Sequence, residues 1–556
     1  MFKSKDLDDQ LLKQRREAEE KDAERRAKKY GLGHLDLIST KVPTEIKAMQ
    51  LVPETDAKEA MLVPLQLVRK TLIIALFDPE NAKAKEIIEG LRTKGKLEVK
   101  IVVVSMSGLK HAWEYYRYVI PQVDISGRVD IDEAKLSEGQ STVRNLEDMT
   151  KNIRDFKNPF TSQILETILS GALALGASDI HLEPNIKTAE LRLRIDGLLH
   201  TVFSEFSQLI YKSVITRIKL LSNLKLNVQD QPQDGRFTIN AVDRTIEIRT
   251  SLIPSEYGET AVLRILDPIS LKANLEDLGW RADDLEIAVA EIKKPNGLIL
   301  NTGPTGSGKT TTLYAFLRKV VQPEIKIITV EDPIEYHLPG ISQTQVDTEA
   351  GYTFASGLRS ILRQDPNVIL VGEIRDKETA EIALNASLTG HIVFSTLHTN
   401  DAVGAIPRLL DLGIQTNILG PSLSLIIAQR LVRRLCPECR VKSEIKPELE
   451  KKIKEFISAL PGRVAKENYK EISIYEAKGC ERCAGLGYKG RISIFELLQV
   501  DETMEATIYK NPTEIELKDL AKKQGMVSMQ EDGILKSFQG ITSFAEVERL
   551  TGQIAW

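Results

Sequence analysis

The 556-residue chain has four cysteines, few aromatic residues and no long apolar run. Aromatic residues make up 5% of it, and no stretch approaches the ~20 apolar residues that a membrane helix needs. The most apolar candidate, LGIQTNILGPSLSLIIAQRL, is interrupted by Gln, Asn, Gly and Pro, and the first residues lack the apolar core of a signal peptide. These absences predict a cytoplasmic protein that meets a membrane only through a partner.

The net charge is also small, at -4, so the chain lacks the strong positive charge that attracts nucleic acid. With 42% hydrophobic and 28% charged residues, its composition is that of an ordinary globular protein. Because single cores stop growing at roughly 250–300 residues, this length predicts three or four domains.

Shifts in composition and hydrophobic period divide the chain into six segments. The N-terminal segment is almost entirely charged, which predicts a solvated helix, with a docking arm as the alternative. Strand and helix patterns alternate in the fifth segment, which predicts a parallel sheet flanked by helices. The predicted segments are a charged helix or arm at 1–30, a small α+β domain at 31–120, a flexible linker at 121–154, a mixed α+β domain at 155–272, the parallel-sheet domain at 273–435, and a cysteine-containing region at 436–556.

The strand pattern GLILNTG leads directly into GPTGSGKTTT, which fits G-x-x-x-x-G-K-[ST]. Glycines in such a loop let successive backbone N–H groups point at phosphate oxygens, the lysine reaches the β- and γ-phosphates, and the hydroxyl of Thr310 ligates Mg²⁺. A chance glycine-rich turn is the alternative, but the strand before the loop and the helix after it both favour a P-loop. The predicted ATP-binding residues are Gly303, Pro304, Thr305, Gly306, Ser307, Gly308, Lys309, Thr310 and Thr311.

Further polar residues follow the next buried strands. ITVEDPIEY places Glu331 and Glu335, with Asp332, just past a buried strand, and Glu373 ends NVILVGE. The carboxyl ends of parallel strands gather around a ligand, where a carboxylate can hold the metal or orient a water. His391 and His398 frame the strand IVFSTL; a strand histidine is usually structural, but two framing one strand favour a role at the site.

These motifs together resemble the secretion ATPase superfamily, which includes type IV pilus assembly motors and type II secretion motors. The marks are the P-loop, an acidic box (TVEDPIEY), a Walker B strand ending in Gly-Glu (ILVGEIRD) and a histidine box (GHIVFSTLHTNDA). The resemblance implies a RecA-like P-loop motor domain at 273–435, a preceding PAS-like domain, and a hexamer that turns ATP hydrolysis into movement of an inner-membrane platform protein.

The resemblance also implies roles for individual residues. Glu373 would act on metal or water, Glu331 and Glu335 would be the acids nearest the γ-phosphate, and His391 and His398 would sense or stabilise that phosphate. Which carboxylate is the general base stays open. The second domain is rich in arginine, and its candidate fingers for the phosphates are Arg194, Arg236, Arg249 and Arg264, with pairing to local acids such as Asp196 or Glu247 as the alternative.

The four cysteines form two Cys-x-x-Cys pairs, Cys436 with Cys439 and Cys480 with Cys483. Two such pairs in a reducing compartment predict one closed, structural zinc site, with a redox pair as the alternative. In the superfamily, this tetracysteine and an extra N-terminal domain are typical of assembly and secretion motors and not of retraction motors.

The resemblance therefore implies a hexameric ATPase for type IV pilus assembly that uses ATP, Mg²⁺ and Zn²⁺ at the cytoplasmic face of the inner membrane. Its expected partners are the platform protein and cytoplasmic assembly proteins. A type II secretion ATPase is the closest alternative. A DNA-uptake or nucleic-acid translocase is less favoured because basic and aromatic residues are not interleaved. A non-hydrolysing scaffold is disfavoured by the complete set of site residues. No cyclic dinucleotide is assigned to the N-terminal domain.

Overall fold

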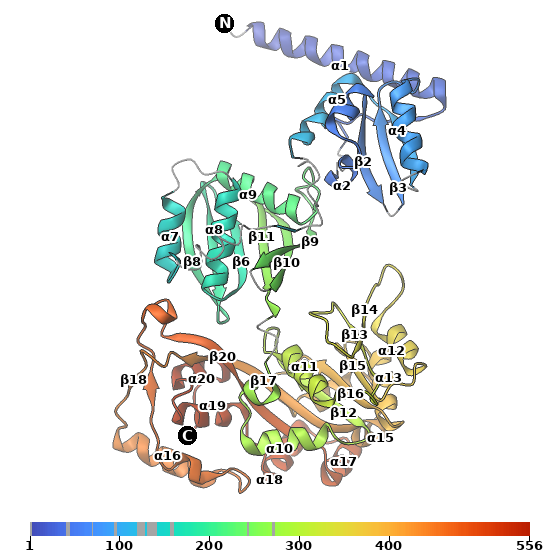
Figure 1. Cartoon of the computed structure of the whole chain (residues 1–556). Helices are drawn as coiled ribbons and strands as arrows, with labels where there is room; N and C mark the ends of the chain where they lie inside the picture. Colours follow the sequence, from blue (N-terminus) through green and yellow to red (C-terminus); the bar gives the residue numbers. More distant parts are fainter. Residues whose placement is uncertain are drawn as a thin grey trace. The chain divides into compact units, whose positions relative to one another are not determined.

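The computed structural model describes residues 3–40, 45–68, 70–93, 97–118, 128–129, 142–155, 161–241, 244–268 and 273–556. The chain divides into two compact units, Met1–Asp267 and Pro268–Trp556 (Figure 1). No helix in the described ranges combines the length and apolarity that crossing a bilayer requires.

The first unit begins with a small α+β fold around a four-stranded sheet of order β1-β4-β3-β2. β4 lies parallel to β1 and β3, whereas β2 and β3 form an antiparallel pair. Three of the strands, β2, β3 and β4, and helix α4 coincide with the apolar patterns that the sequence shows between residues 62 and 105. The elements are α1 (Lys3–Tyr30), β1 (Gly33–His34), α2 (Ile46–Met49), α3 (Glu54–Glu59), β2 (Leu62–Val68), β3 (Thr71–Leu76), α4 (Ala82–Thr93), β4 (Glu98–Val103) and α5 (Met106–Trp113).

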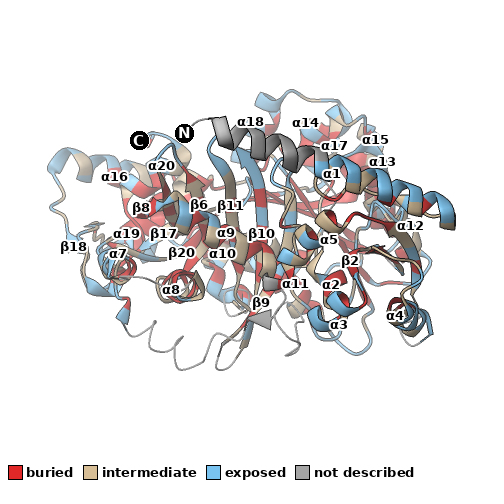
Figure 2. Ribbon diagram, turned by 90° about the horizontal axis from the view of Figure 1, so that it is seen from above, coloured by how far each residue is buried: buried red, intermediate tan, exposed pale blue. Residues whose placement is uncertain are grey.

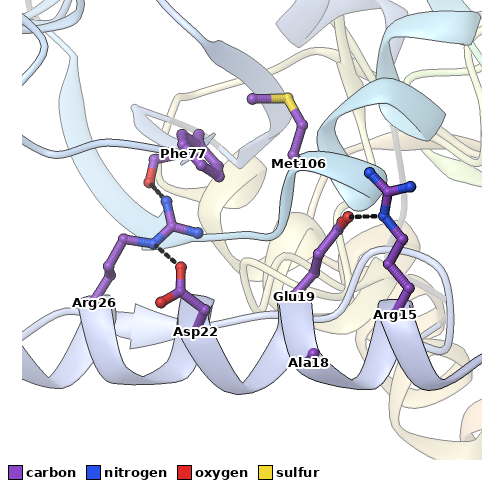
Figure 3. Close-up of a pocket in the computed structure, with 7 residues that line it drawn as sticks. All are labelled: Arg15, Ala18, Glu19, Asp22, Arg26, Phe77 and Met106. Carbon is purple, nitrogen blue, oxygen red and sulfur yellow. Dashed lines mark hydrogen bonds and ion pairs between the residues drawn. The ribbon is translucent and has the colours of Figure 1, made fainter.

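The charged N-terminal segment is the helix α1, and its second half contacts the small sheet domain through polar groups. The guanidinium of Arg26 lies 3.7 Å from the centre of the Phe77 ring, and Glu20 pairs with His34 at 2.9 Å. A pocket of about 430 Å³ lies between the helix and the domain, bordered by Phe77 and Met106 (Figure 3). The exposed side of this half of α1 is solvated (Figure 2), whereas Ala23 and Ala27 are buried, so small apolar side chains contribute to the contact beside the charged groups.

A seven-stranded sheet of order β5-β9-β10-β11-β6-β7-β8 forms the rest of the first unit. All its pairs are antiparallel except that of β5 with β9. Alternate residues of β7 are buried, as expected for a sheet that is covered on one face. The elements are β5 (Arg128–Val129), α7 (Leu146–Arg154), α8 (Thr161–Ala174), β6 (Ala177–Pro184), β7 (Thr188–Ile195), β8 (Leu198–Ser207), α9 (Gln208–Leu221), β9 (Gln233–Ala241), β10 (Arg244–Ser255) and β11 (Gly258–Leu266).

Helix α7 lies inside the segment that the sequence predicts to be a flexible linker, and most of the remaining linker falls outside the described residues. Asn145 caps the helix by accepting a hydrogen bond from the backbone of Asp148. Met149 and Ile153 are buried, and Met149 packs so closely on Gly171 of α8 that a Cβ there would lie 2.9 Å from its sulfur. Two apolar residues one turn apart do not form a repeat long enough to distinguish a helix from a polar linker.

The second unit is built on a seven-stranded sheet of order β14-β13-β15-β16-β12-β17-β20. The first six strands are parallel, and β20 closes the edge in antiparallel pairing with β17. β12, β13, β15 and β16 are buried along their whole length, as expected for a sheet with helices on both faces. The elements up to β17 are α10 (Ala282–Glu291), β12 (Gly297–Thr302), α11 (Lys309–Val320), β13 (Ile327–Glu331), β14 (Ser342–Gln345), α12 (Phe354–Leu362), β15 (Val368–Val371), α13 (Lys377–Leu388), β16 (Ile392–Leu397), α14 (Ala405–Asp411), α15 (Thr416–Ser422) and β17 (Leu423–Leu435).

The C-terminal part of the chain is continuous with this sheet, since β20 supplies its last strand. The cysteine pairs lie just beyond the end of β17 and before β20, and a two-stranded ladder of β18 and β19 lies between them in the chain. The elements are β18 (Val441–Lys442), α16 (Pro447–Ala459), β19 (Tyr475–Glu476), β20 (Tyr488–Gln499), α17 (Glu502–Tyr509), α18 (Glu514–Lys523), α19 (Met529–Phe538) and α20 (Phe544–Thr551).

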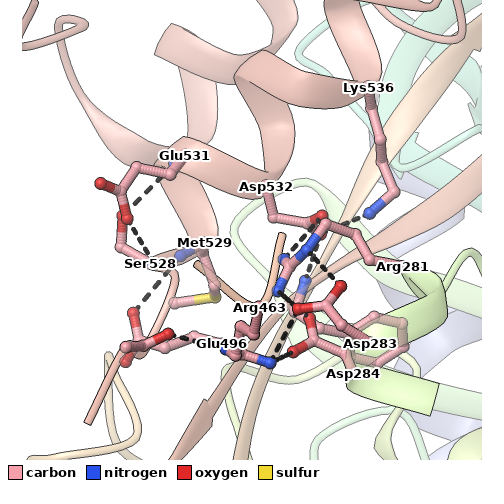
Figure 4. Close-up of polar contacts among 12 residues, drawn as sticks. Arg281, Asp283, Asp284, Arg463, Glu496, Ser528, Met529, Glu531, Asp532 and Lys536 are labelled. Atoms are coloured by element: carbon pink, nitrogen blue, oxygen red, sulfur yellow. Dashed lines mark hydrogen bonds and ion pairs between the residues drawn. The ribbon is translucent and has the colours of Figure 1, made fainter. Parts of the chain in front are cut away.

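A buried charged cluster ties the C-terminal helices to the start of the second unit (Figure 4). Arg281, before α10, pairs with Asp284 at 2.6 Å and with Asp532 of α19 at 3.2 Å. Arg463 also pairs with Asp284, at 2.7 Å, and Lys536 pairs with Asp532. Every one of these charges has a partner of opposite sign, which offsets the cost of burying it. The ion pairs also hold α19 in one position against the residues before α10.

Glu496 of β20 joins the same helices to the loop that follows β16 (Figure 4). Its two carboxylate oxygens accept hydrogen bonds from the backbone N–H groups of Ala402, at 2.8 Å, and Met529, at 3.3 Å. Burial raises the pKa of Glu496 to about 7, although the two N–H donors act to lower it. The carboxyl group therefore links a loop near the predicted nucleotide site to the first residue of α19.

Candidate functional site

The loop between β12 and α11 has the geometry of a phosphate cradle. Gly303, Gly306 and Gly308 have φ angles of 146°, 77° and 93°, which side-chain-bearing residues rarely adopt. Helix α11 begins at Lys309, so its free N–H groups and the positive end of its dipole face the loop. The hydroxyl of Ser307 is buried and has no hydrogen-bond partner among the described residues, so it is available to a ligand oxygen. The loop therefore fits the phosphates of a nucleoside triphosphate.

Lys309 is buried at the start of this helix, and its ammonium group donates to two loop carbonyls. The acceptors are the oxygens of Gly303, at 2.7 Å, and Pro304, at 3.1 Å. Burial lowers the pKa of Lys309 to about 8, and the nearby carboxylate of Glu373 partly opposes this shift. Lys309 and the carboxylate of Glu373 therefore interact electrostatically.

Glu373 follows β15, and its side chain is 15% exposed. One oxygen pairs with Arg375 at 2.5 Å and the other lies 3.6 Å from Nε2 of His398. The strand β16 lies between β15 and β12, and its carboxyl end brings His398 beside Glu373. The carboxyl ends of β15, β16 and β12 thus place a carboxylate, a histidine and the P-loop together.

His391 and His398 lie at opposite ends of strand β16. Its backbone oxygen accepts from the N–H of Gly297, at the beginning of β12, and its Nδ1 lies 3.0 Å from the oxygen of Ala386. β12 and β16 are parallel, and the P-loop follows the other end of β12. The structure therefore does not bring His391 together with the other predicted site residues.

Glu331 ends β13 and is buried with both carboxylate oxygens in hydrogen bonds. Tyr314 of α11 donates to Oε2, and Thr329 donates to Oε1 at 2.5 Å, with the amide of Gln343 3.2 Å from the same oxygen. Burial and the carboxylate raise the pKa of the Tyr314 phenol. Glu335 interacts with the same phenol through its backbone. The acidic box thus holds α11 against β13.

The four predicted arginines lie in one cross-strand row of the first unit's sheet. Arg236 is opposite Arg249, and Arg249 is opposite Arg264. Arg264 is opposite Asp179, which is opposite Arg194. Directly paired residues of antiparallel strands point to the same face, so five adjacent strands present four guanidinium groups and one carboxylate along a single line.

Asp179 neutralises only part of this arginine row. It accepts from Arg264 at 2.9 Å and lies 3.5 Å from Arg194, while Arg249 pairs with Glu247 of its own strand at 3.2 Å. The side chain of Arg264 nevertheless remains 58% exposed. Because like charges on facing positions destabilise a sheet, this excess of positive charge suits an anionic ligand.

The four cysteines converge at the ends of β17 and β20. Their sulfur atoms all lie within 4.8 Å of one another, and the Cys436–Cys480 and Cys439–Cys483 distances are 3.8 and 3.7 Å. Four thiolates around one zinc, with Zn–S bonds of ~2.3 Å, lie about 3.8 Å apart. The backbone N–H groups of Gly479 and Gly487 donate to the sulfurs of Cys439 and Cys483, at 3.3 and 3.2 Å. The cluster therefore fits a structural metal ion.

The polar residues that connect these strand ends were not predicted from the sequence. The hydroxyl of Thr302, the last residue of β12, lies 2.8 Å from the backbone N–H of Thr399 and 2.8 Å from its hydroxyl. Gln429 contributes a buried amide beneath the P-loop. Their only signal was a polar side chain in a largely apolar strand, which is common in protein cores.

Two sequence families match the chain. The family described as "Type II/IV secretion system protein" matches residues 155–549. The family described as "MshEN domain" matches residues 30–119.

Individual relatives cover most of the chain. A protein of Escherichia coli (strain K12) named "Putative type II secretion system protein E" is 46% identical over 388 residues, 70% of this chain and 76% of its own length. The "Type IV pilus assembly ATPase PilB" of Myxococcus xanthus is 36% identical over 524 residues, 94% of this chain and 89% of its own length. A crystal structure of the Legionella pneumophila ATPase DotB matches 72% of this chain and 98% of its own, with a TM-score of 0.51 and 22% identity, and thus shares the fold.

Proposed function

Because the chain belongs to the type II/IV secretion system protein family and is an ATPase, we propose that it is a hexameric motor that powers type IV pilus assembly through an inner-membrane platform protein. The observation that carries this proposal is the length of the similarity to the pilus assembly ATPase of Myxococcus xanthus. That alignment covers 94% of the chain, including the N-terminal domain, whereas the type II secretion relative aligns with 70%.

Type II secretion is the second candidate function. The relative of that name is the more similar one over the aligned part, at 46% identity against 36%. The two functions share the ATPase site, so they differ in the filament that is assembled and not in the chemistry.

In the proposed cycle, the loop of Gly303–Thr310 binds the phosphates of ATP through its backbone N–H groups and Lys309. The hydroxyl of Thr310 would hold Mg²⁺, which neutralises phosphate charge when bound. Glu373 orients and deprotonates the attacking water, because its ion-pair partners Arg375 and His398 are themselves more than half exposed and leave the carboxylate accessible at the strand ends. His398 holds Glu373 from the neighbouring strand.

Glu331 is less suited to act on water, since both of its oxygens already accept hydrogen bonds from buried donors. We assign it the role of positioning α11. The arginine row supplies positive charge to the nucleotide phosphates in the assembled ring. The four cysteines would hold zinc, which would fix the region after β17 when bound.

ATP turnover by the purified chain tests the enzyme's mechanism. Glu373→Gln keeps the shape and removes the base, so turnover should fall by about 10²–10⁴-fold while the affinity for ATP changes little. Glu331→Gln is the matched control: it should chiefly lower thermal stability, because it alters the hydrogen bonds to Tyr314 and Thr329. Turnover that survives in E373Q and disappears in a folded E331Q would reverse the two assignments.

The cellular role is tested separately in the source bacterium. Strains carrying Lys309→Ala should lack surface pili and still export proteins normally. Loss of protein export with intact pili would favour the type II secretion candidate instead.

A further inference from the structure

A buried polar network lies beneath the P-loop and centres on Gln429. This residue of β17 is 1% exposed, in a strand that is otherwise mostly apolar. Its side-chain oxygen accepts from Nδ2 of Asn301, at 2.9 Å, and from the hydroxyl of Thr312, also at 2.9 Å. Its side-chain N–H donates to the hydroxyl of Ser493, at 2.9 Å.

The three partners come from three different elements. Asn301 lies in β12, the strand that enters the P-loop, and Thr312 lies in the first turn of α11, the helix that leaves it. Ser493 lies in β20, on the far side of β17 from the loop strand. One amide oxygen therefore joins the two ends of the loop, while the amide nitrogen is attached to a strand outside it.

Gln429 also contacts the loop glycines directly. A Cβ at Gly303 would lie 2.4 Å from the backbone oxygen of Gln429, and a Cβ at Gly308 would lie 2.7 Å from its side-chain nitrogen. Both distances are shorter than real Cβ atoms show, so a side chain at either glycine would displace Gln429 or the loop. The glycines at these two positions are therefore required by the approach of Gln429 as well as by their positive φ angles.

A P-loop binds phosphate only if its N–H groups keep their relative positions, and those positions depend on the distance between the strand end and the helix start. We propose that Gln429 is the positioning residue of this nucleotide site: it fixes that distance by binding Asn301 and Thr312 with one oxygen. This inference rests on the proposed nucleotide-binding function of the loop. A residue that only packs in the core would affect stability without a specific effect on the affinity for ADP.

The test compares the ADP affinity and thermal stability of three variants with the unsubstituted chain. Gln429→Met keeps the length and volume of the side chain and removes its hydrogen bonds to the loop, so the Kd for ADP should rise about tenfold, as expected for the loss of two neutral hydrogen bonds. Thr312→Val removes only the bond from α11, and its Kd should rise about threefold.

Ser493→Ala is the matched control, because it removes the third bond of Gln429 and leaves both bonds to the loop. It should lower the melting temperature as the other variants do and keep the Kd within about twofold. If S493A loses as much affinity as Q429M, or if folded Q429M and T312V bind ADP normally, the proposal is wrong. If Q429M does not fold, the comparison of T312V with S493A decides.

Failure of this proposal is distinguishable from failure of the proposed function. If the unsubstituted chain does not bind ADP, the nucleotide site itself is wrong. If it binds ADP and the variants do not differ, only the role of Gln429 is lost.

Discussion

At the scale of single residues, Glu331 and Glu373 look alike in the sequence and differ in their surroundings. Glu331 ends a buried parallel strand and Glu373 follows one, and each lies in an acidic motif. Glu331 is enclosed by Tyr314 and Thr329, whereas Glu373 interacts electrostatically with Lys309 and lies beside the exposed side chain of His398. Which acid can reach a water is therefore decided by the neighbouring side chains and not by the motif.

The lowered pKa of Lys309 predicts a pH dependence of nucleotide affinity. Burial lowers this pKa to about 8, and phosphate binding favours the protonated form, so binding takes up a proton when the pH is above 8. Affinity should consequently weaken as pH rises, by about tenfold between pH 7 and pH 9, in ADP titrations at fixed ionic strength.

Lys309→Ala serves as the control for titration of the nucleotide itself. Its affinity should be low and nearly independent of pH over the same interval. An unsubstituted chain with an equally flat profile would show that Lys309 stays protonated without the phosphate.

At the scale of elements, the cysteine cluster holds together a region with little regular structure. Between β17 and β20 the described chain has one substantial helix, α16, and the short ladder of β18 and β19. Apolar side chains of this region, such as Ile453 and Tyr469, pack against α19, whereas the four sulfurs join its two ends, so we expect a bound metal to fix those ends. In closed four-thiolate sites the metal contributes directly to folding, by ~10–16 kcal/mol in small domains.

We therefore expect the purified chain to contain about one zinc per chain. Removing a ligand, as in Cys480→Ser, should abolish zinc binding, since three thiolates do not close the site. Hydrogen exchange should then accelerate in residues 436–488 and change little in β12 and β15. Far less than one zinc in the unsubstituted chain, or uniform exchange after zinc loss, would contradict a structural metal site.

At the scale of the whole molecule, the chain combines two units with separate cores and different chemistry. The second unit carries the phosphate loop, Glu373 and His398, whereas the first carries the arginine row. In ring motors, cations that approach the γ-phosphate from elsewhere in the assembly compensate the charge of the transition state. This division of charge between units is consistent with the proposed hexamer.

Single Arg→Ala substitutions in the arginine row test this role. At least one of Arg194, Arg236, Arg249 and Arg264 should prove essential, with turnover reduced by about 10³–10⁵-fold and ADP affinity nearly unchanged. Arg154→Ala is the control, because Arg154 pairs with Glu205 on the exposed surface away from the row. Full ATPase activity in all four variants would remove the arginines from the mechanism.

The sequence by itself determined the features that depend on neighbours along the chain. The P-loop, the acidic strand ends and the cysteine pairs are local patterns, because each needs its residue types at fixed spacing. The alternation of strands and helices in the second unit was predictable for the same reason. Helix α7 was missed because only two apolar residues mark its buried side.

Only the tertiary structure decided which of these residues meet. Strand register aligned four arginines that lie far apart in the sequence. Strand direction placed His398 beside Glu373 and left His391 at the other end of β16. Gln429 acquired its position under the P-loop from pairing between β12 and β17. Hydrogen bonding across a sheet joins residues without regard to their separation in the chain, so no spacing in the sequence records these contacts.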